Sequence, residues 1–177
     1  MNAANPMPEF SHTTPLSEIG LKAVHHSLRA SDAERAALAK RFGLISLDSL
    51  FADVSLSSDD IGIIATGTLS ADVVQPCVVS GALVPDRIAE SYTIRFLPEP
   101  TFEPDADIEL DDEDFDTMFH DGRVIDLGEA VAQTLGLAIN PFPRAPNANA
   151  VLQEAGIADG RATGPFAALA ALRKGTE

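Results

Sequence analysis

Apolar and polar residues alternate most clearly in Leu47-Asp-Ser-Leu-Phe-Ala-Asp-Val-Ser-Leu56. In an extended chain, one face of this segment would carry Leu50, Ala52, Val54 and Leu56. Phe51 would lie on the other face. This two-residue period predicts a strand with one buried face. Three more apolar runs follow at 61–69, 71–79 and 86–97, and their short connections favour hairpins in a mainly antiparallel sheet.

Helix signals lie on both sides of this β-rich centre. Ser31 and Glu34 have the spacing of a capping box, which predicts a helix over 32–42. Asp126 is placed to cap a second helix over 127–137. The core face of that helix would carry Leu127, Val131, Leu135 and Ala138. We therefore expect an α+β fold, in which a mainly antiparallel β-sheet or partly open barrel is packed with a few short helices.

The domain organisation is expected to be simple. A polar, proline-containing lead at 1–8 should be disordered, and 9–177 should form a single α+β domain. Within it we expect an acidic loop at about 99–122 and a C-terminal helix at about 165–173. The stretch 147–163 has no regular period and is expected to be irregular.

The charge of the chain is strongly negative. There are 27 acidic and 12 basic residues, a formal net charge of −15, and the acids are densest between Glu99 and Asp121, where there is no lysine or arginine. Such a surface repels a phosphate backbone unless the bases cluster, so non-specific nucleic-acid binding is disfavoured. No window approaches the ~18 apolar residues of a membrane helix. The N-terminus lacks a signal-peptide pattern, and one cysteine fits a reducing cytoplasm.

Patterns for metal binding and catalysis are sparse. The soft ligands are His12, His25, His26, His120 and Cys77. Neighbouring residues of a strand face opposite ways, so His25 and His26 should not grip one ion. Cys77 has no base beside it in the sequence to make it a thiolate, which favours a small buried residue.

The acidic run invites comparison with a calcium loop. Its alternate acids are Asp105, Asp107, Glu109 and Asp111. A calcium loop needs a central glycine, and 101–121 contains none. We expect no metal, no cofactor, no small-molecule substrate and no enzymatic activity. A hydrolase is a remote alternative, which requires a pocket with nearby acids and at least two of His25, His26, His120 and Cys77.

Three blocks of sequence resemble the YceD family, bacterial proteins associated with accumulation of large-subunit ribosomal RNA. The first runs from Ile125-Asp-Leu127 to Pro141-Phe-Pro143, and the second is Gly164-Pro-Phe-Ala-Ala-Leu-Ala-Ala-Leu-Arg-Lys174. The third surrounds Cys77, where many members have Cys-x-x-Cys. The segment 31–42 is similar to the alphaproteobacterial branch. The motif positions are thus Cys77, Ile125, Asp126, Leu127, Pro143 and Pro165. This chain departs from the pattern at Ser80, which stands in place of the second cysteine.

The resemblance implies a non-enzymatic role in 23S rRNA accumulation, processing or large-subunit assembly. Given the charge, a basic ribosomal or assembly protein is the preferred partner, with the 23S rRNA precursor as a second. The partner-binding residues would be Asp105, Asp107, Glu109 and Asp111, with Phe166, Leu169, Leu172 and Arg173 of the C-terminal helix. Alternatively, the acidic run only aids solubility.

An RNA-binding module is the rival interpretation. It would need the positive residues to converge on one face, and the candidates for RNA contacts are Arg87, Arg95 and Arg123, joined by Lys22 and Arg29.

Overall fold

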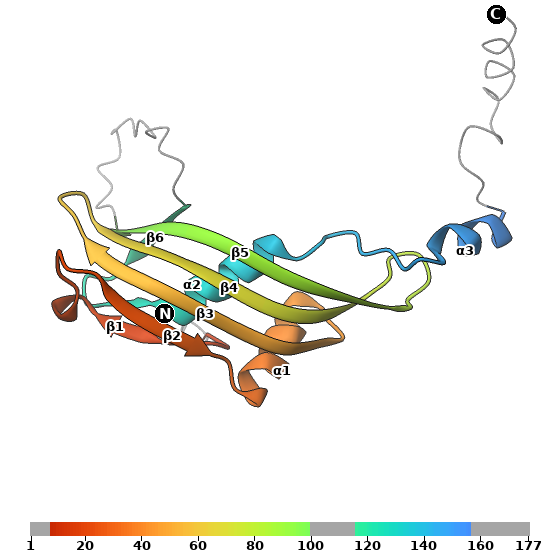
Figure 1. The fold of residues 1–177 in the computed structure, drawn as a ribbon, viewed down its shortest axis with the longest axis horizontal. Helices are drawn as coiled ribbons and strands as arrows, with labels where there is room; N and C mark the ends of the chain where they lie inside the picture. Colours follow the sequence, from red (N-terminus) through yellow and green to blue (C-terminus); the bar gives the residue numbers. More distant parts are fainter. Residues whose placement is uncertain (1–7, 100–115, 157–177) are drawn as a thin grey trace, which may run out of the picture. The chain divides into compact units, whose positions relative to one another are not determined.

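The structure is a computed structural model, and it describes residues 8–99 and 116–156 (Figure 1). The strands are β1 (Thr13–Pro15), β2 (Val24–Arg29), β3 (Ser46–Ser58), β4 (Ile63–Pro76), β5 (Leu83–Pro98), β6 (Asp116–His120) and β7 (Val124–Asp126). The helices are the 3-10 turn η1 (Leu16–Glu18), α1 (Asp32–Phe42), α2 (Leu127–Ala138) and α3 (Ala148–Glu154).

Five strands form the main sheet in the order β2-β3-β4-β5-β6, and β1 pairs with β7 in a small second sheet. The pairs β2–β3, β3–β4 and β1–β7 are antiparallel, while β5–β6 is parallel. In the described part of the chain the main sheet is open, with β2 and β6 at its edges. The predicted α+β class with a mainly antiparallel sheet is confirmed.

The core lies between α2 and one face of this sheet. Figure 1 shows α2 running behind the strands. On β3 the buried face is formed by Leu50, Ala52, Val54 and Leu56, as their alternation predicted. On α2 the predicted face is also correct: Leu127, Val131 and Leu135 are fully buried and Ala138 packs against the core. The two-residue period of β3 and the 3.6-residue period of α2 therefore place their apolar side chains in the same layer.

Helix α1 begins and ends as its sequence predicts. The Ser31 hydroxyl accepts from the Glu34 amide, and the Glu34 carboxylate accepts from the Ser31 amide. Gly43 ends the helix in the left-handed region with φ of 65°, where a side chain would be strained.

Three elements differ from the sequence-based expectation. The runs 61–69 and 71–79 belong largely to one strand, β4, because the alternation of buried positions continues through Ser70. Strand β6 lies inside the range expected to be loop, where Met118 packs against the core. Helix α3 occupies part of the range expected to be irregular. Three predictions concern residues outside the described ranges: the disordered lead (1–7 of it), most of the acidic loop (100–115) and the C-terminal helix.

The chain divides into two compact units. Among the described residues, the first comprises 8–74 with 85–99 and 116–139, and the second comprises 75–84 with 140–156. In the second, the described residues build a small core from Cys77, Ala145 and Ala148. No helix among the described residues is long and apolar enough to cross a membrane.

Candidate functional site

Arg95, one of the predicted RNA contacts, is used inside the fold. Its guanidinium lies 3.0 Å from the Asp59 carboxylate, and the residue is only 8% exposed. Asp59 also accepts from the amides of Gly62 and Ile61, and these bonds, followed by Arg95, lower the pKa of its carboxyl group. Arg95 lies on the same side of β5 as Ser91 and Thr93, but it is buried against Asp59 of the turn between β3 and β4. Arg95 therefore does not fit an RNA contact.

Arg87 and Arg123 are exposed, yet each has a carboxylate nearby. Arg87 lies 3.9 Å from Asp72, and Arg123 lies 3.8 Å from Asp121. Arg87 and Arg95 are eight residues apart on β5, which separates them by about 26 Å along the strand. The three predicted arginines therefore do not make one cationic patch.

A further arginine joins the two main helices of the first unit. Arg41 of α1 binds both carboxylate oxygens of Glu129 at 2.8 Å and also contacts Glu9 at 3.0 Å. Hydrogen bonding to Glu129 raises the pKa of Arg41, and the same contact lowers the pKa of Glu129. Such a two-point bond fixes geometry as well as charge.

The motif residues Ile125, Asp126 and Leu127 hold the fold together. Ile125 and Leu127 are buried in the core, and Asp126 caps α2 by accepting from the Glu129 amide at 3.2 Å. Asp126 also accepts from the Ser11 hydroxyl at 2.6 Å and the His12 amide at 2.8 Å. One carboxylate thus joins the N-terminal segment to the start of the helix.

Gly128 explains how closely that segment approaches α2. A Cβ built at Gly128 would lie 2.7 Å from the Phe10 carbonyl oxygen and 2.8 Å from the His12 nitrogen. The Ile-Asp-Leu-Gly sequence is therefore a structural junction rather than a binding site.

Cys77 lies in a hydrogen-bonded turn of the second unit. Its amide donates to the Ala82 carbonyl, and its own carbonyl accepts from the Gly81 amide, at 2.8 and 2.9 Å. The motif residue Pro143 is buried beside this turn, where its carbonyl accepts from the Val78 amide.

The Cys77 thiol is buried, as predicted, but it is not an inert apolar group. The Ala145 amide donates to its sulfur at 3.3 Å. This bond, with donation from the Ser80 hydroxyl and the Ser80 and Val79 amides, lowers the pKa of the thiol to about 6. Ser80, at the position of the second family cysteine, thus points its hydroxyl at Cys77. Sequence reasoning missed these donors because Ala145 is 68 residues away.

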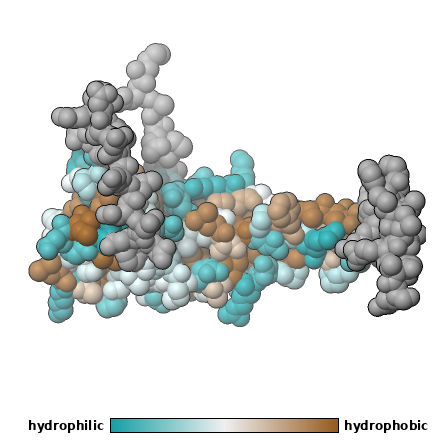
Figure 2. All heavy atoms as spheres, turned by 90° about the horizontal axis from the view of Figure 1, so that it is seen from above, coloured by the Kyte–Doolittle hydropathy of each residue, from teal (hydrophilic) through white to brown (hydrophobic). Residues whose placement is uncertain are grey.

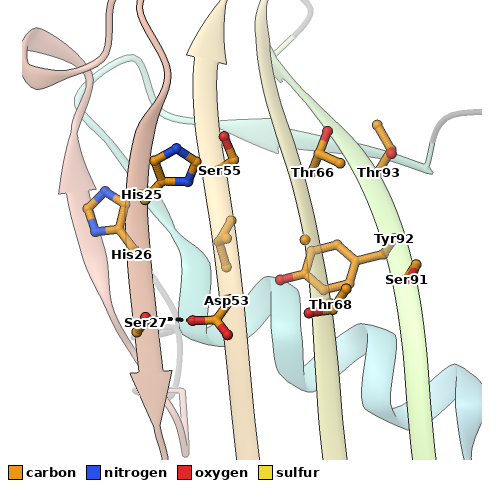
Figure 3. A pocket seen from close by; sticks show the side chains of 12 residues that line it. His25, His26, Ser27, Asp53, Ser55, Thr66, Thr68, Ser91, Tyr92 and Thr93 are labelled. Atoms are coloured by element: carbon orange, nitrogen blue, oxygen red, sulfur yellow. Dashed lines mark hydrogen bonds between the residues drawn. The ribbon is translucent and has the colours of Figure 1, made fainter.

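A polar hollow of about 630 Å³ opens on the main sheet, between β2 and β5. Strand pairing brings its side chains into two rows. Ser27, Asp53 and Thr68 lie opposite one another, and so do His25, Ser55 and Thr66. The lining also includes Ser91, Tyr92 and Thr93 of β5, together with His26, Val54 and Gly67. Figure 3 shows these side chains across the four strands, with α2 behind them.

Asp53 and Tyr92 are the distinctive residues of the polar hollow. Asp53 accepts from the Ser27 hydroxyl at 2.5 Å and is exposed. Tyr92 is 8% exposed, and its hydroxyl has no hydrogen-bond partner among the described residues. The hydroxyl lies next to Gly67, which pairs with buried Val54, so it is on the core face of the sheet, whereas exposed Asp53 is on the outer face. A Cβ at Gly67 would lie 2.8 Å from the hydroxyl oxygen, so only glycine leaves the ring this position. Burial, then the Asp53 charge, raises the pKa of Tyr92 to about 12.

The polar hollow contains His25, His26 and an acid, which is the condition set for the hydrolase alternative. Its chemistry is incomplete for that role. The Ser27 hydroxyl donates to Asp53 rather than to an imidazole, whereas a serine nucleophile needs a base within hydrogen-bond reach. His26 shares a register position with buried Val54, and its Nε2 has no hydrogen-bond partner in 8–99 or 116–156. No group of acids, histidines and cysteine in those ranges could hold a metal ion.

Comparison with known proteins gives one match. The family model described as "Large ribosomal RNA subunit accumulation protein YceD" matches residues 65–173, more than half of the chain. The chain belongs to the YceD family. Neither the curated proteins nor the solved structures provide a match. Membership connects this YceD family member with accumulation of the large ribosomal RNA subunit.

The family match includes the Cys77 turn and the Ile125–Leu127 junction but begins after β3. It therefore covers Thr66, Thr68 and Tyr92 of the polar hollow but not Asp53. Sequence reasoning missed the hollow, although a signal was present: serine and threonine recur on the outward positions of successive strands. Elsewhere, apolar and hydrophilic residues are mixed over the face that Figure 2 shows.

Proposed function

We propose that this YceD family member is a non-enzymatic cytoplasmic factor that supports 23S rRNA accumulation by binding a basic ribosomal or assembly protein. The observation that carries the proposal is the pairing of its arginines with carboxylates. Five of them have an acidic neighbour within 4 Å: Arg35, Arg41, Arg87, Arg95 and Arg123. A guanidinium already engaged by a carboxylate is a poor ligand for phosphate, because the carboxylate must first be displaced.

The remaining charge favours a cationic partner. The net charge of −15 leaves acids in large excess over bases. Such a field raises the local concentration of a positively charged protein and speeds its association. Ribosomal proteins are strongly basic, so an acidic factor could hold one before it meets rRNA. The contact with rRNA would then be indirect.

Two segments outside the described residues are part of the proposal. The acidic stretch carries Asp105, Asp107, Glu109 and Asp111, and the C-terminal stretch carries Phe166, Leu169, Leu172 and Arg173. The first would supply charge complementarity and the second apolar anchors. Both assignments rest on sequence alone.

The experiment is capture of purified large-subunit ribosomal proteins, treated with ribonuclease, on the immobilised full-length chain. One variant converts the four named acids to amides, and a matched control converts four exposed acids elsewhere, Asp48, Asp60, Asp86 and Glu90. Both variants have the same net charge. We expect capture of basic proteins by the wild type and the control, with a clear loss in the first variant. Equal loss in both variants would show that capture depends on net charge alone and not on the four named acids. No capture at all would contradict the proposal.

The RNA-binding module, which also included Lys22 and Arg29, is less well supported, because Arg87, Arg95 and Arg123 are paired with acids and separated. Substituting Arg87 and Arg123 by glutamine should leave the effect on 23S rRNA unchanged under our proposal. If the double variant loses that effect, the RNA-binding alternative is favoured instead.

A further inference from the structure

Strand β5 has a stretch of edge that no described strand covers. In the described part of the chain, β6 pairs with β5 only from Ile94 to Pro98, and no other strand lies on that side (Figure 1). We call residues 86–91, which precede this pairing, the open edge of β5. An uncovered edge presents rows of backbone N–H and C=O groups that can pair with a further strand.

Alternation along β5 decides which backbone groups point away from the sheet. Both groups of one residue point to the same side of a strand, and those of the next residue point to the other side. The Glu99 amide donates to the His120 carbonyl on the β6 side, at 3.2 Å. By the same alternation, the odd-numbered residues of the open edge point to that side. These are Arg87, Ala89 and Ser91, and all three are exposed.

Three observations agree with this assignment. Ala82, an even-numbered residue just before β5, bonds on the β4 side, where its carbonyl accepts from the Cys77 amide at 2.8 Å. The Arg87 amide donates to the neighbouring Asp86 carboxylate, as expected for an amide outside the β4 ladder. Pro85 is odd-numbered and has no amide proton, and a sheet tolerates proline where that proton would point away from the ladder. The odd-numbered backbone groups are therefore directed away from β4, toward the uncovered side.

The charge around the open edge suits a basic segment. Asp86 and Glu90 are exposed, and the one base of this stretch, Arg87, lies 3.9 Å from Asp72. A second copy of this chain is disfavoured as the occupant, because each copy has a net charge of −15 and would bring acids against acids. A lysine-bearing strand would instead be attracted to this edge.

We propose that the open edge receives an extended segment of the basic partner, which adds to the sheet as a further strand beside β5. This inference rests on the proposed function for the nature of the partner. Main-chain hydrogen bonds would supply most of the affinity. Exposed ion pairs contribute little by comparison, so neutralising Asp86 and Glu90 would leave most of the binding in place. The acids select a basic segment, and the backbone groups hold it.

The test uses hydrogen–deuterium exchange of single backbone amides in the full-length chain, measured by nuclear magnetic resonance. The probe is the peptide acetyl-Thr-Lys-Thr-Val-Thr-Lys-Thr-amide. The control is the same peptide with N-methyl groups on its three central residues, which keeps both charges but removes the central amide donors. The amides of Ala89 and Ser91 should exchange fast in the free chain. Saturating probe should slow their exchange roughly tenfold or more, and the control peptide should not.

Two substitutions of one residue test the open edge in the protein itself. Ala89→Pro removes an outward amide and should weaken binding of the probe roughly tenfold, because one hydrogen bond is lost. Ala89→Val changes the side chain at the same place but keeps the amide, so it should bind like the wild type. Thermal denaturation establishes that both variants are folded. If Ala89→Pro unfolds, the two peptides still decide the question on the unaltered chain.

The inference is overturned if the probe and control peptides act alike, or if Ala89→Val weakens binding as much as Ala89→Pro. It is also overturned if the amides of Ala89 and Ser91 are already protected in the free chain, because the chain itself or a second copy would then cover the edge. Protection of these amides by oligouridylate, but not by the probe, would overturn it as well.

These failures differ from failure of the proposed function. Capture of basic ribosomal proteins that is unchanged by Ala89→Pro would overturn only the open edge as the site.

Discussion

The Arg95 guanidinium lies 3.0 Å from the Asp59 carboxylate, across the turn that joins β3 to β4. Arg95 is the most buried of the predicted RNA contacts, and this ion pair engages its guanidinium within the fold. The pair also represents a wider pattern, because five arginines of the described residues are placed beside an acid. The preference for a basic partner over RNA follows from this arrangement.

Removal of the buried arginine should affect stability rather than rRNA binding. Arg95→Leu is expected to lower Tm clearly, because it leaves Asp59 without its ion pair. Arg87→Leu, at an exposed position on the same strand, should change the free energy of unfolding by no more than about 0.5 kcal/mol. Thermal denaturation followed by circular dichroism compares them. An equal effect would mean that the Arg95–Asp59 contact adds nothing.

The Cys77 thiol should ionise near pH 6 in the folded protein. It is the single cysteine of the chain, so thiolate absorbance in the ultraviolet reports on it alone. The folded pKa lies below the ordinary value of 9.0. The ionised thiol therefore stabilises the folded protein fully above pH 9.0, and this stabilisation is lost as the pH falls through about 6. Wild type should gain stability over Cys77→Ala between pH 6 and 9. A thiolate midpoint above pH 8 would contradict the role of the Ala145 amide.

Tyr92 should give the opposite dependence at alkaline pH. Its folded pKa is raised from 10.0 to about 12, so its contribution is present below pH 10 and is lost as the pH rises toward 12. Relative to Tyr92→Phe, the wild type should lose about 2 kcal/mol over this range. Urea denaturation at pH 9 and pH 11.5 measures the difference. Parallel curves for the two proteins would show that the hydroxyl is not buried.

The core face of α2 can be tested with two leucines of the same helix. Leu135 is fully buried, and Leu137 is 79% exposed. Leu135→Ala should cost about 3 kcal/mol of unfolding free energy, through lost burial and the cavity left behind. Leu137→Ala should cost less than about 0.5 kcal/mol. Chemical denaturation of both variants checks the orientation of the helix, and a reversed order would contradict it.

Elements governed by local pattern could be predicted from the sequence. The alternation around Leu50 and the Ser31–Glu34 capping box each depend on neighbouring residues, and both are present as expected. Strand β6 could not be predicted in this way, because its pairing with β5 is parallel and its sequence lies beside a dense acidic run. Helix α3 is only seven residues long, too short for a periodic signal.

Features of the candidate site depended on distant contacts. The donor to Cys77 comes from Ala145, and the partner of Arg95 comes from a turn 36 residues away. Neither relation is visible along the chain. One part of the polar hollow has a signal in the sequence, since Thr66 and Thr68 flank Gly67 on outward positions of β4. The assembly of the hollow from four strands could be seen only from the register of strand pairing. The same holds for the Tyr92 hydroxyl, which has no hydrogen-bond partner among the described residues.

The measurement that tests the account most directly is binding of the labelled full-length chain to protein-free 23S rRNA transcript and, separately, to ribonuclease-treated large-subunit ribosomal proteins. Both titrations are made at low and at physiological salt. We predict saturable binding to one or more basic proteins, weakened by salt because the contact is electrostatic, and no saturable binding to the transcript. Saturable binding to the transcript without any bound ribosomal protein would contradict the account.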